Sequence, residues 1–263
     1  MRFASFGTVP SWFAVLEDHE SAGPVGAALR AQATHELSHP TGRPLLIGCW
    51  PQGTVTTGQA GQTRLALIGQ HAITPSQLAD AAGRVRALAD VDRLAASLAG
   101  SSHLVASVAG HVRVQGTVTG VRRVFHARIG GTAVAADRAD ILAGLLDAGL
   151  DTQRLALHLL EPHILYPLAG QPIWQGVAVV PTNHYLVLEG DGRHRLVRSW
   201  TPPEPVVSMA EGAPALREAL SAAVATRTRG HELVSCDLGG LDSTSLCSLA
   251  ARGESKVDRK SVV

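Results

Sequence analysis

The sequence predicts an α+β front domain over residues 1–200, followed by the first helix, strand and loop of an α/β domain. Three observations support this prediction. Short apolar segments bounded by glycine-containing turns recur through residues 44–198, interleaved with segments of helical periodicity. A proline-rich stretch at 201–205 is extended and stiff, as is typical of a linker. Beyond it, a helical segment, a short apolar strand and a pair of glycines follow one another.

Apolar or alternating runs between turn residues predict the strands of the front domain. These strands are expected at 44–50, 54–57, 63–69, 103–108, 111–116 and 121–126. The first three are separated by glycine-containing turns and therefore predict a meander. A last hairpin is expected to pair 185–188 with 195–198 across the turn-forming residues 189–192.

Apolar residues at helical spacing predict the helices of the front domain. The first covers 75–98, with Thr74 as its N-cap and a break near Asp90. A second covers 138–148 and ends before a glycine, and a third covers 152–160 and is stopped by Pro162.

The C-terminal part is predicted to contain a linker at 201–213 and a helix that begins near Pro214 and ends at Gly230. A strand at 233–238, a glycine turn and a helix start at Ser245 follow. Free backbone N–H groups and the helix dipole converge at such a turn, which predicts an anion site. Ser243 or Thr244 is expected to cap the helix. The open alternative is an ordinary glycine turn.

Composition excludes several classes of function. The 23 basic and 22 acidic side chains give a formal charge of +1 and form no basic cluster, so no nucleic-acid partner is expected. No secretory signal and no membrane span are evident, which predicts a cytoplasmic protein without a membrane partner. The 12 histidines are scattered singly, so no metal site is predicted. Cys49, Cys236 and Cys247 are expected to be buried, reduced thiols.

The last ten residues differ in composition from the rest. Only two of the 23 basic residues are lysines, and both, Lys256 and Lys260, lie there. The segment 258–263 also resembles a translated sequencing-library adapter. We therefore expect a reading frame cut near Gly253 and a non-native tail at 254–263. The alternative is a genuine polar C-terminus.

The glycine turn carries a family resemblance. Residues 239–244 resemble the Ser-Gly-Gly-x-Asp-Ser pyrophosphate loop (PP-loop) of the ATP-pyrophosphatase families, and 234–238 and 244–247 resemble the lasso-peptide macrolactam cyclases of the asparagine synthetase-like family. The resemblance implies that residues 214–253 are the first part of an ATP-binding domain. It also implies the use of Mg²⁺, held mostly by residues farther along. Six residues would bind ATP: Gly239, Gly240, Leu241, Asp242, Ser243 and Thr244. Where the family has Ser before the glycines, this chain has Leu238.

The front domain resembles the class II glutamine amidotransferase domain, which implies an αββα sandwich. The resemblance lies in four segments: 63–69, 120–125, 134–142 and 181–186, with Asn183 where glycine is usual. A working glutaminase of this class needs a cysteine at position two, and this chain has Arg2 there. The front domain is therefore expected to be catalytically inactive, and no catalytic residue is assigned.

The expected function is that of an ATP-dependent amide ligase. It would adenylate a precursor-peptide carboxylate for attack by the peptide's N-terminal amine, and the resemblance implies a leader-binding protein and a leader peptidase as partners. The alternatives are a glutamine-hydrolysing asparagine synthase, a β-lactam synthetase-like enzyme and, for these 263 residues alone, an inactive scaffold.

Overall fold

The computed structural model describes residues 11–160, 170–253 and 255–261. The chain forms two compact units. The front unit holds residues 1–69, 74–96 and 102–201, and the second unit holds 202–263 together with the short segments 70–73 and 97–101. Arg2 and Pro162 lie outside the described residues. In the described part of the chain, no helix is long and apolar enough to span a bilayer.

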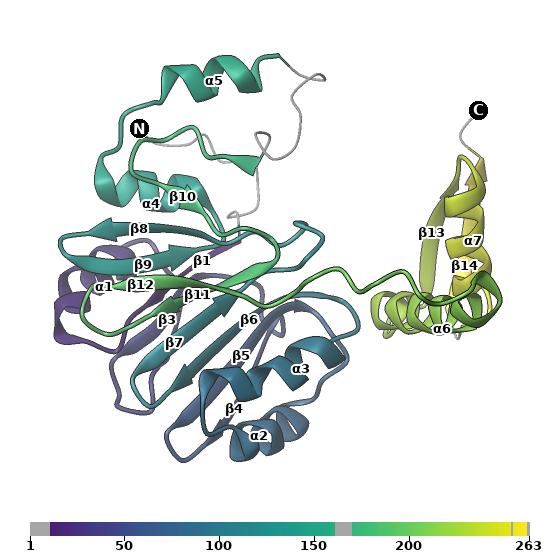
Figure 1. Cartoon of the computed structure of the whole chain (residues 1–263), viewed down its shortest axis with the longest axis horizontal. Helices are drawn as coiled ribbons and strands as arrows, with labels where there is room; N and C mark the ends of the chain where they lie inside the picture. Colours follow the sequence, from purple (N-terminus) through teal and green to yellow (C-terminus); the bar gives the residue numbers. More distant parts are fainter. Residues whose placement is uncertain (1–10, 161–169, 254, 262–263) are drawn as a thin grey trace. The chain divides into compact units, whose positions relative to one another are not determined.

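The front unit is built on two six-stranded sheets (Figure 1). The first contains, in spatial order, β10 (Ala178–Val179), β8 (Phe125–Ile129), β9 (Thr132–Ala136), β1 (Trp12–Leu16), β3 (Pro44–Cys49) and β2 (His35–Ser38). The second contains β12 (His194–Arg198), β11 (His184–Leu188), β7 (His111–Gln115), β6 (Ser101–Val108), β5 (Thr63–Gln70) and β4 (Val55–Ala60). All neighbouring strands of the first sheet run antiparallel.

Side-chain alternation along β1 places the core on both faces of the first sheet. Phe13 and Val15 belong to the apolar cluster that also contains Val105 of β6 and Leu186 of β11 in the second sheet. The intervening residues of β1, such as Leu16, belong to a second cluster on the opposite face. Because successive strand residues point to opposite faces, β1 is a central strand buried on both sides.

Helices cover the outer faces of the two sheets, giving four layers. Leu29 of α1 (Gly23–Arg30) and Leu142 of α4 (Ala139–Leu146) pack into the outer cluster of the first sheet. On the other side, α2 (Pro75–Arg84) lies directly on β4, where a Cβ at Gly58 would collide with the α2 backbone. Figure 1 shows α4 on one side of the sandwich and α2 and α3 (Val91–Ser97) on the other. The predicted α+β architecture with two sheets is confirmed.

Several predicted elements of the front unit are confirmed and others are wrong. Thr74 caps α2 through a capping box with Gln77, as its sequence predicts. The hairpin of β11 and β12 is also confirmed. The long helix predicted at 75–98 is broken earlier than Asp90, after Arg84, and resumes as a 3₁₀ turn (Leu88–Asp90) and α3. The strand predicted at 121–126 starts only at Phe125, since residues 116–124 form a tight loop.

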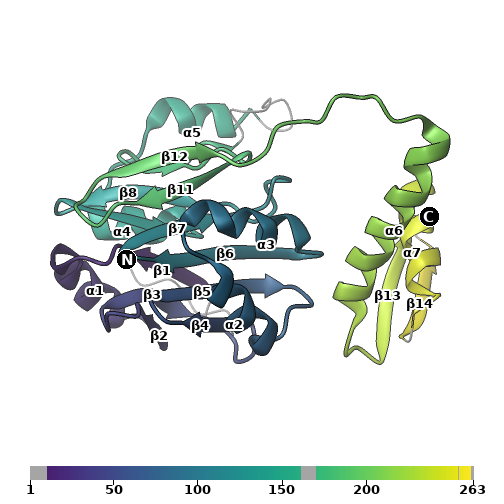
Figure 2. The ribbon, with the colours of Figure 1, turned by 60° about the horizontal axis from the view of Figure 1, so that its bottom comes forward.

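The second unit contains α6 (Met209–Thr228), β13 (Leu233–Leu238), α7 (Leu241–Ala250) and β14 (Lys256–Ser261), all labelled in Figure 2. β13 and β14 pair in parallel, from Leu233 opposite Lys256 to Leu238 opposite Ser261. Parallel neighbours need a crossover connection, and α7 supplies it. The unit is thus a helix followed by one βαβ element.

The predicted start of α6 near Pro214 is wrong. The helix begins at Met209, after the N-cap Ser208, whose hydroxyl accepts the backbone N–H of Glu211 while the Glu211 carboxylate accepts the N–H of Ser208. Pro214 therefore lies inside the helix rather than in its first turn. The predicted end at Gly230, with a φ of 79°, agrees with the helix terminus at Thr228.

Candidate phosphate-binding site

The glycine turn joins the end of β13 to the start of α7 without an intervening loop. Gly240 is extended (φ 174°, ψ −169°) and forms the N-cap of α7, which begins at Leu241. The helix start predicted at Ser245 is therefore wrong by one turn. Leu241, Asp242, Ser243 and Thr244 all lie in the first turn of α7, where backbone N–H groups have no intrahelical acceptor before Thr244.

Two backbone donors converge on one oxygen atom at this turn. The N–H of Gly239 lies 2.9 Å, and the N–H of Gly240 3.1 Å, from Ser243 Oγ, with the nitrogens as donors. The hydroxyl in turn donates to the carbonyl oxygen of Gly240 at 3.1 Å. Ser243 Oγ thus occupies the position that an anionic oxygen would take between two N–H donors at a helix N-terminus.

The turn is open to solvent. A Cβ added to Gly239 or to Gly240 would meet no atom within 4 Å. Leu241 is 88% exposed, and Asp242 and Thr244 are also exposed. The turn is therefore not covered by neighbouring side chains in the described part of the chain, so the backbone has room to approach a bulky anion.

All six predicted ATP-binding residues lie in one turn because they are contiguous in sequence. The N-cap is Gly240 and not Ser243 or Thr244 as predicted, although Ser243 contributes to the cap from the third helical position, where its hydroxyl accepts the N–H of Gly240. The hydrogen bond from Gly240 to Ser243 Oγ is not predicted from the sequence. Its signal was a serine at the third helical position, which forms half of a capping box.

Leu238 ends β13 and is half-buried, opposite Ser261 of β14. It is the residue that stands where the family has serine. An apolar residue at this position contributes packing instead of a hydroxyl donor. Donors at the turn are thus the backbone N–H groups and the hydroxyls of Ser243 and Thr244.

Cysteines and metal-ligand clusters provide no second site in the described residues. Cys49, the front unit's cysteine, is 4% exposed on β3, and its Sγ donates to the carbonyl oxygen of Gln32 at 3.2 Å. Cys247 is a buried residue of α7, and Cys236 is half-buried in β13. Within residues 11–160, 170–253 and 255–261, no group of three or more His, Cys, Asp or Glu residues could hold a metal ion.

The comparison with known families matches the segment that contains the glycine turn. Residues 215–262 match the asparagine synthase family. The matched segment contains β13, the glycine turn and α7 entire, together with most of α6. It therefore supports an asparagine synthetase-like relationship for this segment, and it does not distinguish among the members of that family. It also includes β14, and the non-native origin of residues 254–263 stays a prediction.

Two solved structures are similar over most of the chain. One is glutamine phosphoribosylpyrophosphate amidotransferase from B. subtilis complexed with ADP and GMP, at a TM-score of 0.41 and 13% identity over 95% of this chain and 65% of that chain. The other, an allosteric regulatory enzyme of purine biosynthesis, has a TM-score of 0.41 and 11% identity over 95% of this chain and 64% of that chain. A TM-score of 0.41 does not establish a shared fold. No curated protein matches the chain.

Proposed function

We propose that the protein carrying this chain is an ATP-dependent amide ligase that closes a macrolactam in a precursor peptide, as in lasso-peptide biosynthesis. One observation carries the proposal. The N–H groups of Gly239 and Gly240 converge on a single oxygen position at the start of α7, within the segment that matches the asparagine synthase family. Preorganised donors of this kind stabilise a departing anion.

The residues present fit the phosphates of ATP. Two backbone donors, an open approach over both glycines and the positive end of α7 suit a polyanion. ATP bound there would supply an adenylyl group that activates a carboxylate of the peptide, with pyrophosphate as the leaving group. The residues that would hold that pyrophosphate are Gly239, Gly240, Leu241, Asp242, Ser243 and Thr244. A phosphate oxygen would replace Ser243 Oγ as the acceptor of the two backbone N–H groups. Ligands for Mg²⁺ are proposed to lie elsewhere in the protein.

The front unit is proposed to be a scaffold related to class II glutamine amidotransferases that does not hydrolyse glutamine. Residues 1–11 contain no cysteine before β1, and the thiol of Cys49 is buried and donates to a carbonyl. An amine that belongs to the substrate peptide makes ammonia unnecessary. Holding both reacting groups in one molecule also supplies part of the rate.

The proposed activity is that of the whole protein. The present chain spans 65% and 64% of the length of the two solved chains above. The second candidate functions are glutamine-hydrolysing asparagine synthase and β-lactam synthetase, which the same family match supports equally. A leader-binding protein and a leader peptidase are the proposed partners. For the 263 residues alone, we propose an inactive scaffold.

Three assays on the product of the full open reading frame separate these functions. Incubated with ATP, Mg²⁺ and a precursor peptide, a macrolactam ligase removes one water from the peptide and releases AMP and pyrophosphate. Glutamate release from glutamine with formation of asparagine would contradict the proposal in favour of asparagine synthase. Closure of a small β-amino acid without turnover of the peptide would favour β-lactam synthetase. For this chain alone, ATP–pyrophosphate exchange above background would contradict the proposal that it is an inactive scaffold.

A further inference from the structure

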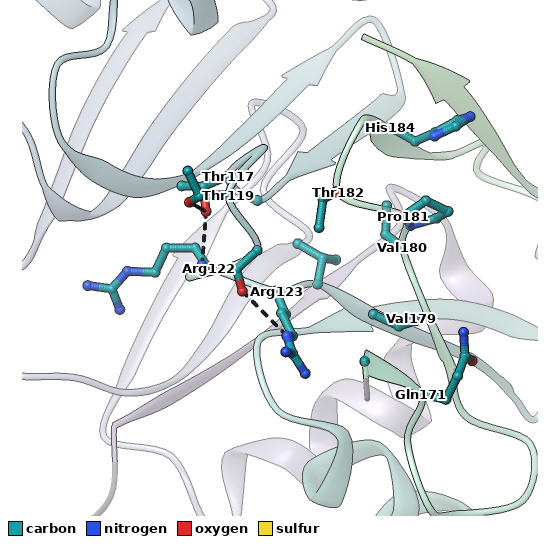
Figure 3. A pocket seen from close by; sticks show the side chains of 14 residues that line it. Thr117, Thr119, Arg122, Arg123, Gln171, Val179, Val180, Pro181, Thr182 and His184 are labelled. Carbon is teal, nitrogen blue, oxygen red and sulfur yellow. Dashed lines mark hydrogen bonds between the residues drawn. The ribbon is translucent and has the colours of Figure 1, made fainter. Parts of the chain in front are cut away.

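The front unit contains a cavity of about 250 Å³ that shares no residue with the glycine turn. It lies between the loop 116–124, which joins β7 to β8, and the segment 179–184, which leads from β10 into β11 (Figure 3). Gly170 and Gln171 complete its lining. Because the walls come from distant parts of the sequence, no local motif marks this cavity.

One wall of the cavity is a tightly bonded loop. The N–H of Thr117 donates to the carbonyl oxygen of Arg122, and the N–H of Arg122 donates to Thr117 Oγ1, both at 3.0 Å. A Cβ at Gly116 would collide with the same Arg122 carbonyl. The carbonyl of Arg123 is held at 2.9 Å by Nε2 of the buried His103. A wall fixed in this way loses little conformational freedom when a ligand binds.

Two arginines line the cavity, and neither forms an ion pair with a carboxylate of the described residues. Its lining includes Arg122, Arg123 and His184 and no Asp or Glu. Among the described residues, Arg123 Nε donates one long hydrogen bond of 3.4 Å, to the carbonyl oxygen of Gly120. Arg122 Nε is buried and has no hydrogen-bond partner in the described part of the chain. Figure 3 shows the two arginine side chains leaving the loop in different directions.

The remaining walls are mostly apolar. Val124, Val179, Val180 and Pro181 line the cavity beside the hydroxyls of Thr117, Thr119 and Thr182. Guanidinium groups bind carboxylates with directed, charge-assisted hydrogen bonds, and aliphatic walls bind an apolar group. A fully hydrated inorganic anion would gain nothing from the aliphatic walls.

We propose that this cavity is a binding site for a carboxylate attached to a small aliphatic group. Two sources share this chemistry: a free short-chain acid and the C-terminal residue of a peptide. The site is independent of the proposed ligase function, since it rests on the front unit alone.

The test is a titration of the ¹⁵N-labelled full chain, followed by backbone amide shifts. The probes are 3-methylbutanoate for a free acid, N-acetyl-leucine for a peptide C-terminus, the neutral 3-methylbutanamide and inorganic phosphate. We expect saturable shifts in residues 116–124 and 179–184 with at least one carboxylate, bound roughly 10-fold more tightly than the amide or phosphate. The tighter carboxylate identifies the source. Equal binding of the amide, or tighter binding of phosphate, overturns the proposal.

Variants of the chain separate the contribution of the arginine charges to carboxylate binding from that of the cavity's shape. Arg122→Gln combined with Arg123→Gln is expected to weaken carboxylate binding about 10-fold. Val179→Phe, which fills the cavity without changing its charge, is expected to abolish it. Arg84→Gln, on the exposed end of α2, is the matched control and should bind like the parent. Unchanged affinity in the folded double variant or in folded Val179→Phe overturns the proposal.

Discussion

Asp137 is a carboxyl group whose ionisation opposes folding. It follows β9, and the backbone N–H of Phe13 donates to its Oδ1 at 2.8 Å. Burial raises the pKa of Asp137 to about 6, although the Phe13 hydrogen bond acts in the opposite direction. The folded protein therefore binds this proton more tightly than the unfolded chain, whose carboxyl has its ordinary pKa of 3.8. The stability due to Asp137 is complete below pH 3.8 and is lost as the pH rises through about 6.

Asp137→Asn is predicted to stabilise the protein at neutral pH. The amide oxygen can still accept from Phe13, while the buried charge is removed. We expect the free energy of unfolding to rise by about 1–3 kcal/mol at pH 7.5 and to change little at pH 4. Urea unfolding at the two pH values measures the difference. The same change at both pH values would show that the charge of Asp137 is not responsible.

At the scale of elements, α6 combines a strong start signal with an internal proline. Pro214 has no N–H to donate to the carbonyl of Ala210, four residues earlier in the helix. Pro214→Ala should therefore stabilise α6 by about 1–3 kcal/mol, and Ser208→Ala, which removes the cap, should destabilise it by about 1 kcal/mol. Hydrogen exchange of the α6 amides measures both changes. Slower exchange in the Ser208 variant, or faster exchange in the Pro214 variant, would contradict this account of the helix.

Elements with local signals could be predicted from the sequence, and those fixed by tertiary packing could not. The cap of α2 at Thr74 and the β11–β12 hairpin follow from residues within a few positions of one another. The strand β1 shows no polar alternation because both of its faces are buried, and it was not predicted. β2, α1 and the parallel pairing of β14 were also missed.

The two candidate sites differ in whether their residues are close together in the sequence. The glycine turn was found because its residues are contiguous, although the bond from Gly240 to Ser243 Oγ needed the geometry. The cavity lined by Arg122, Arg123 and Thr182 brings together residues about sixty positions apart, so only the folded chain shows it.

At the scale of the whole molecule, the second unit exposes many large apolar side chains. They are Val206, Val207, Met209, Leu216, Leu233, Leu241 and Leu246. Exposed apolar surface of this extent favours association. We predict that the chain self-associates as its concentration rises, as measured by sedimentation velocity. Leu216→Gln combined with Leu246→Gln should reduce the association, whereas Val121→Gln in the front unit should not. A monomer at all concentrations would contradict the prediction.

Titration of ATP and of inorganic pyrophosphate, with Mg²⁺, into the ¹⁵N-labelled chain tests the central claim most directly. We predict saturable shifts of the Gly239 and Gly240 amides and of the first turn of α7. Gly240→Val keeps an allowed extended backbone and fills open space beside the turn, so binding of a bulky phosphate should weaken about 10-fold or more, while Ser245→Val should bind like the parent. Absence of shifts at both glycines, or unchanged affinity in folded Gly240→Val, would contradict a phosphate site at this turn.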